Sequence, residues 1–506
     1  MHLFGIETEY GITREDLDAV DPVEESMELV RAHLTGDFER RWDYRGEDPH
    51  EDARGFRVSG LQQDQEEDDF AKLDAHRPYS FHDMKSDLVL PNGARFYNDH
   101  THPEYSTPEC RTLKDLLAHD RAGERIVQRA ADRRNQQLGG AHVQLYKNNT
   151  DFHGHSYGCH DNYLVPRSLS FPQLVSGLLP FLVSRQLLAG AGKVGMEAQE
   201  SGYVPGPFQL SQRADFMEAE LGVDTMHNRP ILNTRDEPHA DRTKYRRLHL
   251  ILGDANMCEY ATALKVGTTR LVLEVLQRGA APELELEQPV AAIKQLSRDP
   301  DVKAVVRLKD GRTLSGLAIQ EEYWHAASRA CAGSDPDADW VLREWQETLR
   351  LLAQDRTQLV GKLDWVTKQW LLETFMREER LTWEDPWLAS LDLEYHNVSP
   401  ERGLFLGLEA EGKTWRMTTD RDIAEALTAG PADTRGGLRG LCVRRFSTEI
   451  SGMQWERVQF SGGLRSRTLE MGDLFEPDAV RACAALWETA ASPAEALAAW
   501  TKRKEP

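Results

Sequence analysis

The sequence predicts an α+β fold, in which an antiparallel sheet with helices forms a large domain and a small C-terminal domain follows it. Two observations favour this class. Several short segments alternate between apolar and polar residues, as strands with one buried face do; they are residues 3–12, 94–99, 141–146 and 245–252. Longer segments instead carry apolar residues at helical spacing; they are residues 24–35, 171–190, 262–278, 340–353 and 363–381.

The composition limits the function classes. The 506 residues are 40% hydrophobic, enough for a sizeable core, and their formal net charge of −22 excludes a broad nucleic-acid-binding surface. We find neither an apolar run of transmembrane length nor a basic and apolar leader pattern, so we expect a cytoplasmic protein without membrane contact. The six cysteines lie far apart without a CxxC pair, which predicts reduced, mostly buried thiols.

The first strand, residues 3–12, places Glu7 and Glu9 on one face and Phe4 and Ile6 on the other. Two carboxylates on one strand face repel each other unless a cation lies between them. The alternative is a solvated strand face, because exposed glutamates are common.

Residues 41–87 show no sustained period and are rich in Asp, Glu, Gln, Gly and Arg. This pattern predicts a long, mobile loop, and such loops inside a compact domain are usually functional or disordered. The acidic run at residues 65–69 is typical of solvated surface.

The strand after this loop carries much of the candidate site. Arg95, Tyr97 and Asp99 share one of its faces. Pro103 is incompatible with an ordinary central ladder, so we expect the strand to end near a cleft. Glu104 follows and offers oxygen atoms to a hard cation.

Two further strands add polar residues. His160 and Asn162 share a face of one, and Arg247 and His249 share a face of the other. Arginine suits phosphate oxygens and histidine suits a metal, although a half-exposed strand with incidental charges explains the second pair equally well. Together these faces predict a sheet that cradles a metal–nucleotide. The candidate magnesium ligands and phosphate-binding residues are Glu7, Glu9, Glu104, Arg95 and Arg247.

Beyond about residue 420 the pattern changes to short helical and strand segments, ending in an Ala-rich helix from Asp478. We therefore predict a catalytic domain at 1–420 and a small domain at 421–506. The arginines at 439, 444 and 445 are expected to form part of a basic groove or a solvated basic face. The tryptophans of two helices before this point are predicted to be core aromatics: Trp340, Trp345, Trp365 and Trp370.

Six motifs together resemble those of the Pup ligase and depupylase family, nearly end to end. They are GIETEYG (5–11), NGARFYND (92–99), HPEY (102–105), SYGCH (156–160), NTRDEPHAD (233–241) and YRRLH (245–249). The resemblance implies a glutamine synthetase-like, carboxylate–amine ligase-like large domain, with ATP and Mg²⁺ lying on a curved antiparallel sheet.

The resemblance also implies roles for single residues. Asp99 stands where the family has its catalytic aspartate. The implied metal ligands are Glu7, Glu9, Tyr97, Glu104, His160 and His249. The implied ATP contacts are Arg95, Thr107, Arg247 and Trp455. Arg213 and Arg235 are candidates for binding the carboxylate end of the ubiquitin-like protein Pup.

Within the family, the motifs RWDY (41–44) and DARGF (52–56) resemble the loop that depupylases carry and ligases lack. The implied reactions are hydrolysis of the isopeptide bond between the C-terminal glutamate of Pup and a substrate lysine, and deamidation of a C-terminal glutamine of Pup. Asp99 acts either as a general base on water or as the nucleophile. The implied partners are Pup and pupylated proteins, with a functional link to a bacterial proteasome.

Residues 148–151 and Cys159 look more like the ligase branch. A Pup–protein ligase is therefore one alternative, and a non-catalytic Pup-binding regulator is another. An acidic protein that binds an acidic modifier also needs a local basic groove.

Overall fold

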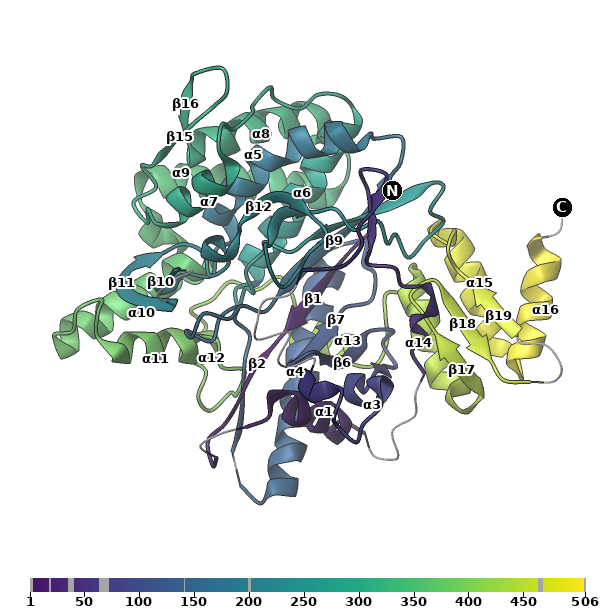
Figure 1. Cartoon of the computed structure of the whole chain (residues 1–506). Helices are drawn as coiled ribbons and strands as arrows, with labels where there is room; N and C mark the ends of the chain where they lie inside the picture. The colour runs from purple at the N-terminus through teal and green to yellow at the C-terminus, as the bar shows by residue number, and fades with distance from the viewer. Residues whose placement is uncertain are drawn as a thin grey trace.

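The computed structural model describes residues 3–17, 20–34, 41–62, 72–140, 142–198, 202–462 and 467–504. A six-stranded sheet in the order β14–β9–β1–β7–β6–β5 lies at its centre (Figure 1), and every neighbouring pair is antiparallel. The predicted antiparallel sheet is therefore confirmed. Its strands are β1 (Phe4–Glu9), β5 (Leu88–Val89), β6 (Arg95–Asp99), β7 (His102–Ser106), β9 (Cys159–Pro166) and β14 (Tyr245–Leu250).

One apolar core joins the sheet to two helices, α1 (Pro22–Ala32) and α4 (Leu113–Leu138). Phe96 of β6 and Tyr105 of β7 share this core with side chains from both helices. The sequence reasoning did not predict α4, which starts at the N-cap Thr112 and ends before Gly139, a residue with φ 79°.

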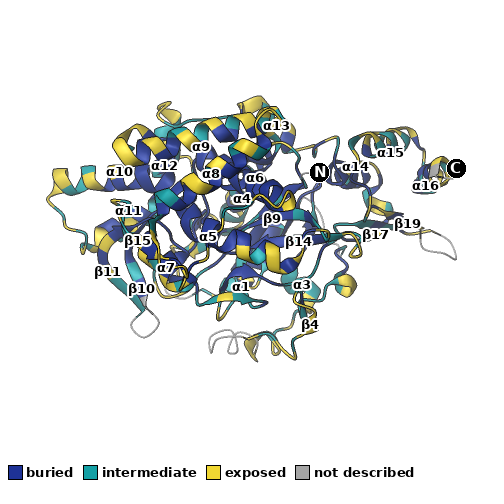
Figure 2. Cartoon of the chain, turned by 90° about the horizontal axis from the view of Figure 1, so that it is seen from above, coloured by how far each residue is buried: buried dark blue, intermediate teal, exposed yellow. Residues whose placement is uncertain are grey.

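The remaining segments of the large domain form a second layer, which consists mainly of helices. The helix α6 (Glu259–Gln277) is buried along nearly its whole length in this layer (Figure 2). The predicted helices at 171–190, 262–278, 340–353 and 363–381 are confirmed within a few residues. The other helices of the layer are α5 (Phe171–Ala189), α7 (Pro289–Ser297), α8 (Gly316–Cys331), α9 (Pro336–Gln354), α10 (Asp364–Glu379), α11 (Pro386–Tyr395) and α12 (Leu404–Ala410).

The core of this layer contains Trp345 and Trp365, both fully buried as predicted, and Trp340 packs against it. Trp370 is different: 37% of its surface is exposed, so its prediction as a core aromatic is wrong. The residue shares α10 with Trp365 but points to solvent.

Short two-stranded sheets extend the framework. They pair β2 (Gly11–Arg14) with β8 (Val143–Tyr146), β10 (Lys193–Ala198) with β11 (Gly202–Gln209), β12 (Ala219–Gly222) with β13 (Pro230–Asn233), and β15 (Val305–Arg307) with β16 (Thr313–Ser315).

The C-terminal part has a hydrophobic core of its own, which begins at Leu438. Its elements are α14 (Arg435–Phe446), β17 (Ile450–Met453), β18 (Arg457–Phe460), β19 (Arg467–Glu470), α15 (Pro477–Thr489) and α16 (Pro493–Lys504). The preceding helix α13 (Asp420–Ala426) packs on α4 instead, through Ala118 and Ala122. The boundary at residue 420 stays a prediction.

Of the arginines at 439, 444 and 445, the last two are exposed and only the first is buried. Arg439 is completely buried, and its Nη2 lies 2.8 Å from Glu109 Oε2. Arg444 donates to the carbonyl of Thr428, and Arg445 donates to the carbonyls that end α15. The prediction of a solvated basic face therefore holds for Arg444 and Arg445, and it is wrong for Arg439, whose buried guanidinium pairs with Glu109.

The α14 helix also approaches the sheet very closely. A Cβ atom on Gly93, which has φ 80°, would lie 2.0 Å from the carbonyl oxygen of Gly436. Only glycine fits this contact and this backbone conformation together.

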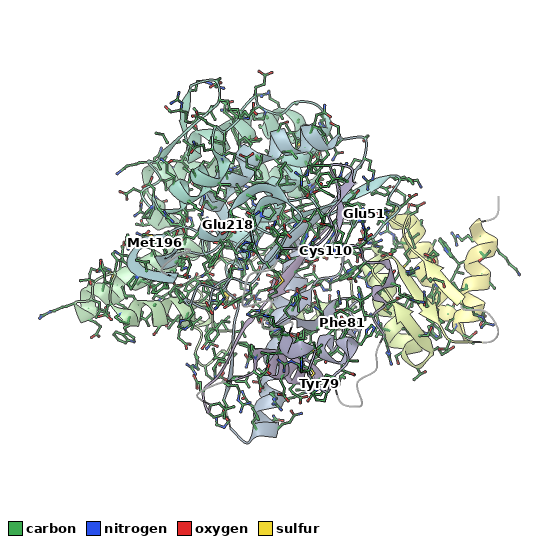
Figure 3. The ribbon with its side chains drawn as sticks, in the orientation of Figure 1. Glu51, Tyr79, Phe81, Cys110, Met196 and Glu218 are labelled. Carbon is green, nitrogen blue, oxygen red and sulfur yellow. The ribbon has the colours of Figure 1, made fainter. Side chains whose placement is uncertain are left out.

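The segment expected to be a long irregular loop contains short regular elements: η1 (Tyr44–Gly46), β3 (Glu51–Asp52), β4 (Phe56–Arg57) and α3 (Phe81–Lys85). The Asp43 amide donates to Met453 O at 2.9 Å, and the Ala53 amide donates to Thr234 O at 2.8 Å. The Glu51 carbonyl accepts from the Asp236 amide at 2.9 Å, and Figure 3 labels Glu51. These short elements interrupt the predicted loop, because their residues pair with distant segments. The acidic run at 65–69 lies outside the described residues, and the mobility of the loop stays a prediction.

The six cysteines are all buried and free, as predicted. Among the described residues, no helix has the length and apolarity needed to cross a membrane.

Candidate functional site

The polar face of the sheet brings the predicted residues together because of strand register. Glu9 of β1 stands opposite Glu104 of β7, which in turn stands opposite Tyr97 of β6. On the other side of β1, Glu7 stands opposite His160 of β9. The alternation predicted from the sequence is therefore confirmed across neighbouring strands.

Pro103 does not end the pairing. The chain turns at His100, which has φ 52°, and continues as β7, with Asp99 opposite His102 and Asn98 opposite Pro103. The strand does end near a cleft as predicted, because β6 stops at Asp99, which lines the larger pocket. The expectation that Pro103 has no place in a central ladder is wrong, because Pro103 is the second residue of β7 and its carbonyl accepts from the Tyr10 amide at 3.0 Å.

One group of side chains that could hold a metal ion consists of Glu7, His160 and His249. The Glu7 Oε2 atom lies 3.3 Å from His160 Nδ1 and 3.5 Å from His249 Nε2. Burial opposes the charge of Glu7, but the two histidines and Arg247 hold its pKa well below the ordinary value. Burial and Arg247 lower the pKa of His249 to about 3, which leaves a neutral imidazole for coordination. The buried Nδ1 of His249 has no hydrogen-bond partner among the described residues.

A second arrangement consists of Glu9, Asp99 and Glu104, whose ligand oxygens lie within 4.8 Å of one another. Burial, followed by the charges of Asp99, Glu7 and Glu9, raises the pKa of Glu104 well above its ordinary value. Burial also raises the pKa of Glu9. This crowding of carboxylates is the physical condition that a divalent cation relieves, and an oxygen-only set suits Mg²⁺.

Tyr97, the remaining predicted ligand, is 9% exposed. Burial, together with Glu104 and Asp99, raises the pKa of the phenol well above its ordinary value, so the hydroxyl is neutral.

Lys85 was not found by the sequence reasoning. Its Nζ lies 2.5 Å from Asp99 Oδ1. Although burial acts to raise the pKa of Asp99, the charge and hydrogen bond of Lys85 hold it below the ordinary value. No sequence signal marks this lysine, which ends a helix of five residues inside the predicted loop.

Arg95 lies in an aromatic and acidic enclosure. Its guanidinium carbon is 4.0 Å from the Trp42 ring centroid and 3.7 Å from that of Tyr97. Its nitrogens donate to Asp87 Oδ1 and to the Tyr44 hydroxyl, at 2.8 and 2.7 Å. Sequence reasoning placed Tyr97 beside Arg95 but missed the other three neighbours, because they belong to the segment predicted to be a loop.

The other predicted phosphate-binding residue, Arg247, donates to Asn162 Oδ1 at 3.1 Å and lies 3.4 Å from Glu7 Oε1. Its side chain borders two adjoining pockets. The larger has a volume of about 560 Å³ and is lined by both candidate metal-binding groups, the one around Glu7 and the one around Glu104. The smaller, about 90 Å³, is mainly apolar.

Thr107 and Trp455 line the smaller pocket. The Thr107 hydroxyl accepts a hydrogen bond from the Ile6 amide at 3.0 Å, and the Trp455 ring lies edge-on to Trp42 at 5.3 Å. A flat apolar recess beside a cavity with two arginines fits a nucleotide, with the base in the recess and the phosphates toward the arginines.

Both candidate substrate arginines line the larger cavity. Arg213 is completely buried and donates to Ile251 O and Ser156 Oγ, both at 2.7 Å. Burial and the neighbouring Arg229 lower the pKa of Arg213 to about 10. Arg235 donates to the Val223 carbonyl at 2.7 Å. Both guanidinium groups are thus held mainly by neutral oxygens, so their charge is available to an anion.

The residues fit a divalent cation, because an orphaned buried imidazole nitrogen and a set of crowded carboxylates border one cavity. An ionised carboxylate, Asp99, reaches the same cavity. Such an arrangement can carry out chemistry at a carbonyl group near a bound nucleotide.

Comparisons with known proteins give a consistent result. The family model described as Pup-ligase protein matches residues 2–459. A Pup deamidase/depupylase from Mycolicibacterium smegmatis is 42% identical over 480 residues, covering 92% of this chain and 94% of the relative. A Pup–protein ligase from Acidimicrobium ferrooxidans is 46% identical over 369 residues, covering 71% of this chain and 80% of the ligase.

The solved structure of the Pup ligase PafA in complex with ADP is similar to this chain, with a TM-score of 0.72 and 36% identity. The similarity covers 87% of this chain and 98% of that structure. The predicted fold class is thereby confirmed.

Proposed function

The chain belongs to the Pup-ligase protein family, and on that premise we propose that it is a depupylase and Pup deamidase. It hydrolyses the isopeptide bond between the C-terminal glutamate of Pup and a substrate lysine, and it converts a C-terminal glutamine of Pup to glutamate. Similarity to a protein named Pup deamidase/depupylase extends over 92% of the chain, against 71% for the ligase, which supports the hydrolytic branch.

The observation that carries the proposal is Asp99, an ionised carboxylate at the end of β6 that lines the large cavity. Both reactions break a C–N bond at one side-chain carbonyl, so one site serves both. Asp99 either takes a proton from the attacking water, or attacks the carbonyl itself to give an anhydride that water then opens. The amine or ammonia leaves in either case.

Other residues of the cavity bind and orient. The proposed magnesium ligands are Glu7, Glu9, Tyr97, Glu104, His160 and His249. When bound, the cation supplies positive charge that stabilises a developing oxyanion. The proposed ATP contacts are Arg95, Thr107, Arg247 and Trp455. Arg213 and Arg235 bind the carboxylate end of Pup.

The partners of this activity are Pup and pupylated proteins, with a functional link to a bacterial proteasome, and its compartment is the cytoplasm. A Pup–protein ligase is the second candidate, because a ligase relative reaches 46% identity.

One assay separates the candidates. Purified protein is incubated with a pupylated protein, ATP and Mg²⁺, and in parallel with unconjugated Pup ending in glutamate and an acceptor protein. We expect release of free Pup in the first reaction and no conjugate in the second. Conjugation without release would identify a ligase. The absence of both activities, with Pup still bound, would identify a non-catalytic regulator.

A further inference from the structure

Lys85 sits in a fixed frame beside Asp99. The helix α3 that ends at Lys85 starts with a capping box, in which Ser80 and Asp83 exchange hydrogen bonds of 3.2 and 3.1 Å. Figure 3 shows Phe81, the first residue of α3, close to the sheet. The Asn98 side chain donates to the Met84 carbonyl at 2.9 Å, so the backbone of α3 is tied to β6 one residue before Asp99.

A second helix holds the end of α3. Arg31 of α1 donates to Asp83 O and to Ser86 Oγ, both at 2.9 Å. Ser86 itself has φ 47°, which turns the chain away immediately after Lys85. These contacts place the base of the Lys85 side chain independently of any bound molecule.

The ammonium group is directed to one oxygen of Asp99. Its Nζ lies 2.5 Å from Oδ1, and it lies 5.7 Å from the Tyr97 ring centroid. The lysine side chain is 14% exposed and that of Asp99 is 29% exposed. The lysine therefore occupies Oδ1 of Asp99, whereas the carboxylate as a whole still reaches the cavity.

Apart from Lys85, the carboxyl groups around Asp99 repel its carboxylate. Ligand oxygens of Glu9 and Glu104 lie within 4.8 Å of it, and Asp99 is the last residue of its strand, directly before the turn at His100. A carboxylate beside two others is repelled by their charge unless a cation offsets it.

We propose that Lys85 is the positioning residue of this site: it holds Oδ1 of Asp99, so that the other oxygen, Oδ2, faces the scissile carbonyl. The inference rests on the proposed function and deepens it by adding a residue that acts through Asp99. Lys85 touches the catalytic carboxylate rather than the substrate, so its loss affects the chemical step more than binding.

The test compares Lys85→Met, which keeps the length but removes the charge, with Lys85→Arg, which keeps the charge. Lys114→Met is the matched control, because Lys114 forms a 2.8 Å ion pair with Asp422 on the surface. For each protein, kcat and KM are measured on a pupylated substrate, and ADP affinity is measured by calorimetry.

We expect Lys85→Met to lower kcat by about tenfold to a hundredfold, because misplacement of a reacting group by about one ångström can cost about 10²-fold in rate. KM and ADP affinity should stay close to wild type, Lys85→Arg should recover part of kcat, and Lys114→Met should behave as wild type. A Lys85→Met enzyme with wild-type kcat would overturn the inference. The inference would also be overturned if Lys85→Met lowered kcat, raised KM and lowered the melting temperature together, and Lys85→Arg recovered none of these. That is the behaviour of a purely structural residue.

A crystal structure of Lys85→Met decides the inference without any activity. We expect the Asp99 carboxylate to rotate away from its wild-type orientation, and an unmoved carboxylate would refute the positioning role. Absence of Pup release by the wild-type protein would count against the proposed function alone, and the crystal structure would still decide the role of Lys85.

Discussion

Replacement of Asp99 by asparagine is the sharpest test of the site, because it removes one charge and almost no volume. If Asp99 is the base or the nucleophile, kcat should fall by about 10²–10⁴-fold or more, the range that a positioned proton-transfer group supplies. The amide cannot take a proton from water and is a poor nucleophile. Binding of ADP should be retained, because the predicted nucleotide contacts lie on other residues.

The structure also predicts the effect on stability. The raised pKa of Glu104 favours its neutral form, so the repulsion to count is that of Glu9: a unit charge at 4.8 Å, the outer limit of these oxygens, repels Asp99 by about 3.5 kcal/mol at an effective dielectric constant of about 20. The Lys85 ion pair at 2.5 Å acts in the opposite direction, and partial exposure of both side chains weakens it. The two effects act in opposite directions and partly cancel, so the melting temperature should change by only about 2 °C.

The assay follows release of Pup at saturating pupylated substrate, with melting temperature measured by differential scanning fluorimetry. Asp310→Asn serves as control, because Asp310 forms a 2.7 Å surface ion pair with Arg312. A rate within threefold of wild type for Asp99→Asn would remove Asp99 from the mechanism. A large fall in melting temperature together with the loss of activity would show that the carboxylate acts in folding instead.

Two other residues give independent predictions. Burial opposes the charge of Glu109, but Arg439 and Arg435 hold its pKa at about 2, below the ordinary 4.5. The ionised carboxylate therefore stabilises the folded protein above pH 4.5, and this stabilisation is lost as the pH falls toward 2. Glu109→Gln should therefore show a smaller drop in melting temperature between pH 5 and pH 3 than wild type. An equal drop for the two proteins would contradict this. Trp42→Ala should weaken ADP binding about fivefold, because removal of one ring stacked on Arg95 costs about 1 kcal/mol. Calorimetry with the exposed Trp370→Ala as control measures the change, and equal affinities would show that the stack does not orient Arg95.

Much of the site was predictable from local pattern. Side chains alternate along a strand, so the shared faces of Glu7 with Glu9, and of Arg95 with Tyr97 and Asp99, follow from the sequence once those segments are read as strands. The same holds for helices such as α5, where apolar residues recur at helical spacing. The family resemblance added the roles, which alternation alone does not supply.

The order of the strands was not predictable in this way. Only the register places Glu9 opposite Glu104 and Glu7 opposite His160, which lies 153 residues further along the chain. A strand carries its own periodicity, but the pattern within one segment holds no information about which strand pairs with it.

Lys85 and Arg439 show the same limit for charged residues. In the sequence, Lys85 is one charge in a polar stretch, and Arg439 belongs to a cluster typical of solvated surface. In the structure, one is bound to Asp99 and the other is buried against Glu109. The sequence by itself determined the strands, the helices and the shared faces of the candidate residues, because these depend on neighbours a few positions away. Tertiary structure alone decided the partners of each charge, because burial and pairing depend on contacts between segments that are distant along the chain.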